Sequence, residues 1–97
     1  MTPESAVLTR LKAAAPQLRQ HAVSALWVFG SVARGEAHEG SDVDILVDFS
    51  SPVSLMELGR LKRLLEELLG RRVDLIVRDG LRPALRDRVM SEAIRAA

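Results

Sequence analysis

Hydrophobic positions recur along this 97-residue chain in two different patterns. In 7–18 and in 55–69 they return every three or four residues, which is the spacing of one face of a helix. Three short apolar runs are instead typical of strands. These runs lie at 25–29, 43–47 and 73–77. A last helical pattern, with Leu85, Val89, Ala93 and Ile94 on one side, follows Pro83.

Residues at the ends of these segments support the assignment. Thr2 and Pro3 are typical of a helix start, and Pro16 should kink or end the first helix because it lacks a backbone donor. Ser54 and Glu57 form the pattern of a capping box, and Gly70 is a typical helix stop. A further short helix could follow the first strand directly.

The connection between the second and third strands is a helix, so these strands should be parallel neighbours. The first strand is apolar on both faces and should be central and covered on both sides, with Trp27 in the core. The leucines of 55–69, Leu55 included, should pack in that core. We therefore expect one α/β domain over 1–97, with a mixed sheet of three or four strands in the order α-β-α-β-α-β-α.

Charge and composition exclude several classes of protein. The chain has no cysteine, which excludes disulfides and thiolate metal sites. No segment has the length of a membrane span or the pattern of a signal peptide, so we expect a cytoplasmic protein. The net charge is only +1, which argues against direct binding of nucleic acid. Residues 60–97 hold ten basic and six acidic side chains, and a solvated helix face is the simplest explanation.

Two carboxylates mark the start of the second strand. Side chains alternate along a strand, so Asp42 and Asp44 point to one face while Val43 and Ile45 point to the other. Asp74 lies near the start of the third strand and would reach the same edge, although for Asp74 taken alone an exposed strand face is the better explanation. Asp48 shares their face at the far end, where we expect a turn residue.

A turn that could hold an anion precedes these acids. Gly30 permits a sharp bend, and the free N–H groups together with the Ser31 hydroxyl could bind a polyphosphate. Arg34 could add a charge-assisted contact. A loop follows, in which His38 and Glu39 could reach a metal, but solvated loop residues are the better interpretation.

Three acids beside a phosphate-holding turn suit nucleotidyl transfer with two Mg²⁺ ions. On this hypothesis Asp42 and Asp44 bridge both ions. Asp74 holds the ion nearer the attacking hydroxyl and accepts its proton.

Two segments carry a resemblance to a known family. They are Gly30-Ser31-Val32-Ala33-Arg34-Gly35 and Ser41-Asp42-Val43-Asp44-Ile45-Leu46-Val47. Together they resemble the signature of the DNA polymerase β-like nucleotidyltransferases, and most closely the minimal nucleotidyltransferases (MNT) of bacteria and archaea. The segment 65–75 and the closing helix are also similar to that family. The resemblance implies that Gly30 and Ser31 hold the nucleotide phosphates, with Arg34 as a further contact, and that Asp42, Asp44 and Asp74 bind the metal.

The resemblance also implies a partner. MNT proteins are commonly paired with a HEPN-domain RNase toxin and act as its antitoxin, transferring AMP from ATP to a toxin tyrosine, in the manner of a type VII system. Two other functions stay open at this point. One is an antitoxin that neutralises its partner by contact alone; the other is transfer to a small molecule such as an aminoglycoside. Homo- or hetero-oligomers are compatible with each.

Overall fold

A computed structural model of the chain describes residues 2–38 and 40–97. In chain order its elements are α1 (Pro3–Ala13), α2 (Ala15–Gln20), β1 (Val23–Phe29), α3 (Gly30–Ala33), β2 (Val43–Phe49), α4 (Leu55–Leu69), β3 (Val73–Val77), the 3₁₀ turn η1 (Arg78–Gly80), α5 (Pro83–Glu92) and β4 (Ile94–Arg95). The expected α/β class and the expected elements are confirmed. The first helix ends at Ala13, with Ala14 as its C-cap, and Pro16 lies in the first turn of α2, where a missing N–H costs little.

The sheet has four strands in the order β3-β2-β1-β4. The strands β2 and β3 are parallel, as the helical crossover predicted, whereas β1 runs antiparallel to both β2 and β4. The mixed sheet is therefore confirmed in its four-strand form. Among the helices of the described residues, none combines the length and apolar content that a membrane-spanning segment needs.

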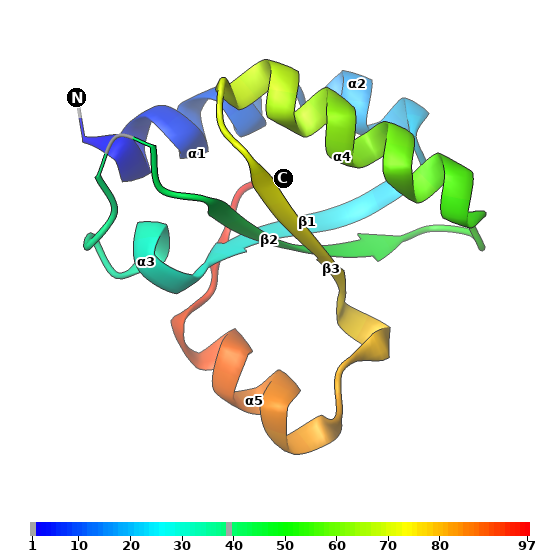
Figure 1. Ribbon diagram of the computed structural model, residues 1–97. Coiled ribbons are helices and arrows are strands. Elements are labelled where there is room, and N and C mark those ends of the chain that lie inside the picture. The colour runs from blue at the N-terminus through cyan, green and yellow to red at the C-terminus, as the bar shows by residue number, and fades with distance from the viewer. Residues whose placement is uncertain (1, 39) are drawn as a thin grey trace.

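The main core lies on one face of this sheet, under α1, α2 and α4 (Figure 1). Its central side chains are fully buried: Leu11, Leu26, Val28, Val32, Val43, Ile45, Val47 and Leu65. The helix α4 begins with the predicted capping box between Ser54 and Glu57 and ends at Gly70, whose φ is +64°. The free energy of folding thus comes chiefly from burying the inner faces of three helices against β1 and β2.

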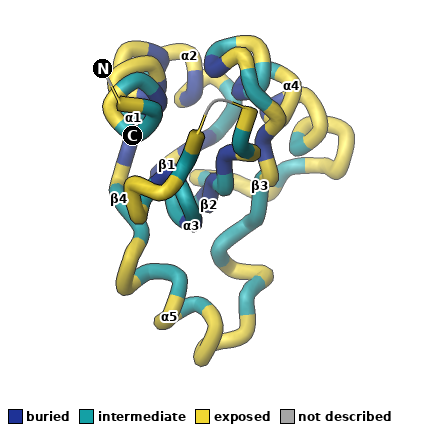
Figure 2. The backbone as a smooth tube through the Cα atoms, turned by 60° about the vertical axis from the view of Figure 1, so that its left-hand side comes forward, coloured by how far each residue is buried: buried dark blue, intermediate teal, exposed yellow. Residues whose placement is uncertain are grey.

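The opposite sheet face is only partly covered, and three expectations about it were wrong. Trp27 is half-buried on this open face rather than in the core. The strand β1 is also not covered by helices on both sides, because α5 stands away from this face of the sheet (Figures 1 and 2). The closing helix also stops at Glu92, and Ile94 pairs with Val28 as part of β4.

Leu55 likewise departs from expectation, since it is 85% exposed at the first position of α4.

Asp48 is not a turn residue. It lies within β2, and its carboxylate binds Arg78 through two short contacts, of 3.0 Å to Nε and 2.8 Å to Nη2. The Arg78 guanidinium in turn lies over the Trp27 ring, 5.2 Å from its centroid.

Candidate active site

The turn between β1 and α3 brings backbone against a carboxylate. Gly30 has a φ of +71°, a left-handed conformation that side chains disfavour. In the antiparallel pairing of β1 with β2, Phe29 lies opposite Asp44, which places Asp44 beside Gly30. A Cβ atom built on Gly30 would overlap the Oδ2 atom of Asp44. Glycine is therefore required at position 30 for two reasons: the left-handed turn and the close approach of the Asp44 carboxylate.

Asp44 also lies next to the acid of the third strand. The parallel register pairs Asp44 with Asp74, so the two side chains project from the same face of neighbouring strands. Asp44 is half-buried, whereas Asp74 is exposed. Burial raises the pKa of the Asp44 carboxyl, and the charges of Asp74 and then Asp42 raise this pKa further. The three acids thus share one electrostatic environment.

Asp42, the third acid, pairs with a cation. Its carboxylate faces Arg72, with 3.8 Å between Oδ1 and the arginine Nε, and both side chains are mostly exposed. In this arrangement, no three acidic or histidine side chains of residues 2–38 and 40–97 stand close enough together to hold a metal ion.

The donor set nevertheless fits a hard divalent cation. Carboxylate oxygens are the ligands that Mg²⁺ prefers, and Asp44 is held by strand pairing on both sides while Asp42 lies just before β2. Asp42 and Asp74 are exposed, so their side chains can change rotamer without disturbing the core. Arg34 lowers the pKa of Asp44 through its charge, although less than the two acids raise it.

Arg34 directly follows α3 and is held by two acids. Its Nε lies 3.2 Å from Oε2 of Glu36, and its Nη1 lies 3.3 Å from Oε1 of Glu92 on α5. The Glu36 hydrogen bond is the main cause of the raised pKa of Arg34. A guanidinium has five N–H donors, so Arg34 retains donors for an anion while both acids fix its plane. Sequence reasoning missed Glu92, because no local pattern signals a partner 58 positions away.

The remaining loop residues give little further chemistry. The backbone N–H of His38 donates to Oγ of Ser41 at 3.1 Å, which shapes the approach to β2. Glu39, the other metal candidate in this loop, lies outside the described residues. Ser31 is half-buried in the first turn of α3.

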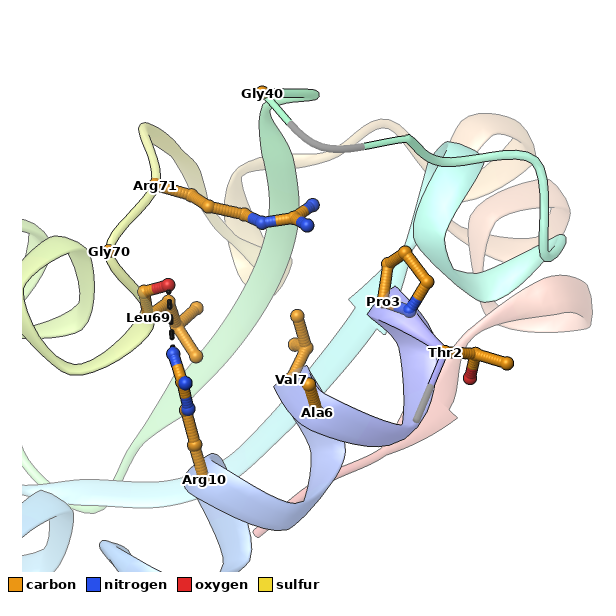
Figure 3. A pocket seen from close by; sticks show the side chains of 9 residues that line it. All are labelled: Thr2, Pro3, Ala6, Val7, Arg10, Gly40, Leu69, Gly70 and Arg71. Atoms are coloured by element: carbon orange, nitrogen blue, oxygen red, sulfur yellow. Dashed lines mark hydrogen bonds between the residues drawn. The ribbon is translucent and has the colours of Figure 1, made fainter.

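A separate hollow of about 630 Å³ lies between α1 and the turn after α4. Figure 3 shows Arg71 extending across it and Arg10 donating to the carbonyl of Leu69, at 3.2 Å. None of the residues that line it belongs to the carboxylate group, so this hollow is distinct from the candidate active site.

Comparison with known proteins shows the family of this chain. A family model described as a nucleotidyltransferase domain matches residues 8–96. A protein of Methanocaldococcus jannaschii, provisionally named a protein adenylyltransferase, is 47% identical over 81% of this chain and 85% of its own length. The protein adenylyltransferase MntA of Thermococcus cleftensis is 47% identical over 74% of this chain and 73% of its own length.

Solved structures extend the comparison. One that is provisionally described as a minimal nucleotidyltransferase is 46% identical, with a TM-score of 0.82 over 97% of this chain and 95% of its own. A more distant one, at 18% identity, comes from a complex of a tri-AMPylated Shewanella oneidensis HEPN toxin with its MNT antitoxin. Its TM-score of 0.68, over 94% of this chain and 71% of that one, shows a shared fold.

Proposed function

We propose that this chain, which belongs to the nucleotidyltransferase domain family, transfers AMP from ATP to a hydroxyl group of a partner protein. Relatives at 47% identity carry the name protein adenylyltransferase, which supports AMP as the transferred group. The observation that carries the proposal is the placement of the Asp44 carboxylate against the Gly30 turn and beside Asp74. Such a site brings acidic groups and a phosphate-binding turn within one small region.

The residues divide the work between holding the nucleotide and handling the acceptor. Gly30 and Ser31 bind the phosphates through backbone N–H groups and the hydroxyl, and Arg34 adds a charged contact. Asp42, Asp44 and Asp74 would hold two Mg²⁺ ions, which when bound would neutralise the charge of the triphosphate and stabilise the transition state. The half-buried Asp44 supplies the fixed point of this group, and the exposed acids adjust around it.

The reaction is an in-line displacement at the α-phosphorus of ATP. The acceptor oxygen forms a bond to this phosphorus, the bond to the bridging oxygen of the β-phosphate breaks, and pyrophosphate leaves. The proton of the acceptor hydroxyl passes to Asp74, which is the exposed acid of the β2–β3 pair. Most of the rate then comes from positioning and from charge stabilisation.

The acceptor in this proposal is a tyrosine of a HEPN-domain partner, for which this chain, folded as one domain over 1–97, is the antitoxin. The distant complex of an AMPylated HEPN toxin with its MNT antitoxin supports this choice. The partly covered sheet face supports it as well, because α5 stands away from this face (Figure 1).

Labelled nucleotide provides the test. The protein is mixed with MgCl₂, α-³²P-ATP and a purified HEPN-domain protein from the same genome, and the labelled residue is located by mass spectrometry. We expect label on a tyrosine with the wild type and none with the Asp42→Asn/Asp44→Asn variant. If that variant protects cells from the HEPN protein as well as the wild type does, neutralisation is by contact. Label on a small acceptor such as an aminoglycoside, without a second protein, would also contradict the proposal.

A further inference from the structure

The first turns of α4 expose an apolar surface that the proposed reaction does not use. Leu55 is 85% exposed and Met56 is 68% exposed, next to each other at the beginning of the helix. Beside them is an open groove of about 560 Å³, between α4 and the ends of β2 and β3. Its apolar lining consists of Phe49, Pro52, Val53, Leu55, Leu58 and Val77. We call Leu55, Met56 and this groove the α4 surface.

Gly59 is a second and independent feature of the same helix face. It lies in the interior of α4, where glycine costs about 1 kcal/mol relative to alanine. Its φ is not left-handed, and a Cβ atom built on it would meet nothing within 4 Å, so the fold of this chain does not require glycine there. Gly59 lies four positions after Leu55 and three after Met56, on the same side of the helix. A bare position beside two exposed apolar side chains allows another helix to approach the backbone closely.

Three exposed cations lie on α4 beside this surface, whereas the groove itself is lined by one acid, Asp79 of η1. Arg60, Lys62 and Arg63 are exposed on α4, and among the described residues no carboxylate lies within ion-pair distance of them. The single acid in these turns, Glu57, is occupied, because its carboxylate accepts from the N–H of Ser54. The partner should therefore be acidic where it flanks its apolar contact.

We propose that the α4 surface binds an amphipathic helix of the partner protein, with acidic residues beside the apolar face of that helix. This inference rests on the proposed function, and it identifies the partner with the HEPN-domain protein that accepts AMP. Phe49 is five residues along β2 from Asp44, a separation of about 17 Å at 3.3–3.4 Å per residue. Docking and transfer therefore occur at opposite ends of the same strand. The partner is held at one end while its acceptor loop reaches the carboxylates across the open face.

The test compares affinity with transfer. Binding of the purified HEPN-domain protein is measured by isothermal titration calorimetry for the wild type, for Leu55→Asp/Met56→Asp and for Gly59→Trp. We expect both variants to bind at least tenfold more weakly, while their affinity for a magnesium complex of a non-hydrolysable ATP analogue is unchanged. Lys62→Glu/Arg63→Glu should also weaken binding, with a smaller dependence on salt than the wild type shows.

Three controls separate this effect from misfolding and from loss of chemistry. Gly59→Ala should raise Tm by about 4–8 °C, because alanine is the better helix former, and should retain partner binding. Gln17→Asp places one new negative charge, half of that in the Leu55→Asp/Met56→Asp variant, on an exposed position of α2 and should bind normally. Asp44→Asn should bind the partner normally but lose transfer, so a failure of the proposed function appears as absent transfer with docking intact.

Several results would overturn the docking proposal. Equal affinity of the wild type and Leu55→Asp/Met56→Asp would show that the partner binds elsewhere, and so would the absence of any measurable affinity in the wild type. A wild type that dimerises alone in sedimentation, together with a monomeric Leu55→Asp/Met56→Asp variant, would instead assign the surface to a second copy of this chain.

Discussion

Replacing Gly30 by alanine tests the contact on which the site depends. The left-handed backbone, with φ at +71°, costs about 1–2 kcal/mol for a residue with a side chain. The added methyl group would also occupy the position of the Asp44 carboxylate oxygen, and relieving such overpacking typically costs about 1–3 kcal/mol. We therefore expect Gly30→Ala to lower the free energy of unfolding by about 2–5 kcal/mol, within the range that a small domain can lose and stay folded.

Gly70 offers a matched control. It has nearly the same backbone angle, with φ at +64°, but a Cβ atom there would meet nothing within 4 Å. Gly70→Ala should therefore cost only about 1–2 kcal/mol. AMP transfer should fall by about 100-fold in Gly30→Ala, because a shift of about 1 Å in a catalytic group has an effect of that order. In Gly70→Ala it should be unchanged.

The assay measures unfolding by urea titration and transfer with labelled ATP, at a temperature where both variants are fully folded. Equal activity of Gly30→Ala and Gly70→Ala would refute the argument that the close approach of Gly30 positions Asp44. Equal stability of the two variants would show that the carboxylate moves away without cost.

Three other changes test separate parts of the structure. In metal-free buffer at pH 7, Asp44→Asn should raise Tm. Burial and the charges of its two neighbours raise the pKa of Asp44, so the wild type gains stability as the pH falls through that pKa. The Tm advantage of the variant should therefore shrink toward pH 4. A Tm advantage that does not change with pH would contradict this explanation. Glu57→Gln should have the opposite profile, because hydrogen bonds from Ser54 lower the pKa of Glu57: the loss of stability should be constant above about pH 4.5 and disappear as the pH falls below it, as seen in thermal melts. Asp48→Asn and Arg78→Gln, measured alone and together, should show a stabilising coupling free energy, since the pair makes two contacts of 3.0 Å or less; additive losses would argue against it.

The sequence was most informative where a pattern was local. Alternation at Asp42 and Asp44, the spacing of Ser54 and Glu57, and the run of leucines in α4 each involve residues within a few positions of one another. The helical crossover then required β2 and β3 to be parallel, which brought Asp74 beside Asp44. The family, the fold and the mixed sheet could all be predicted at this level. The metal-binding role of the acids stays a prediction.

Features that depend on distant pairing were not accessible in the same way. The strand β4 has two residues, and it is recognisable because Val28 pairs with Ile94 and Trp27 with Arg95. The exposure of Trp27 follows from the position of α5, which no spacing in the sequence specifies. Leu55 belongs to the apolar pattern of its helix but lies beyond the part of α4 that covers the sheet, so periodicity alone placed it wrongly in the core.

Because Asp44 pairs with Asp74, AMP transfer should depend on the number of residues in the crossover between β2 and β3. Adding one residue between Gly70 and Val73 keeps Asp74 beside Asp44 only if the extra residue bulges out of the turn. If the strand shifts by one residue instead, side-chain alternation sends Asp74 toward α4 and brings Val73 to the open face. Natural or engineered forms of this enzyme should therefore tolerate added length in the loop before Ser41 more readily than in the short turn before β3.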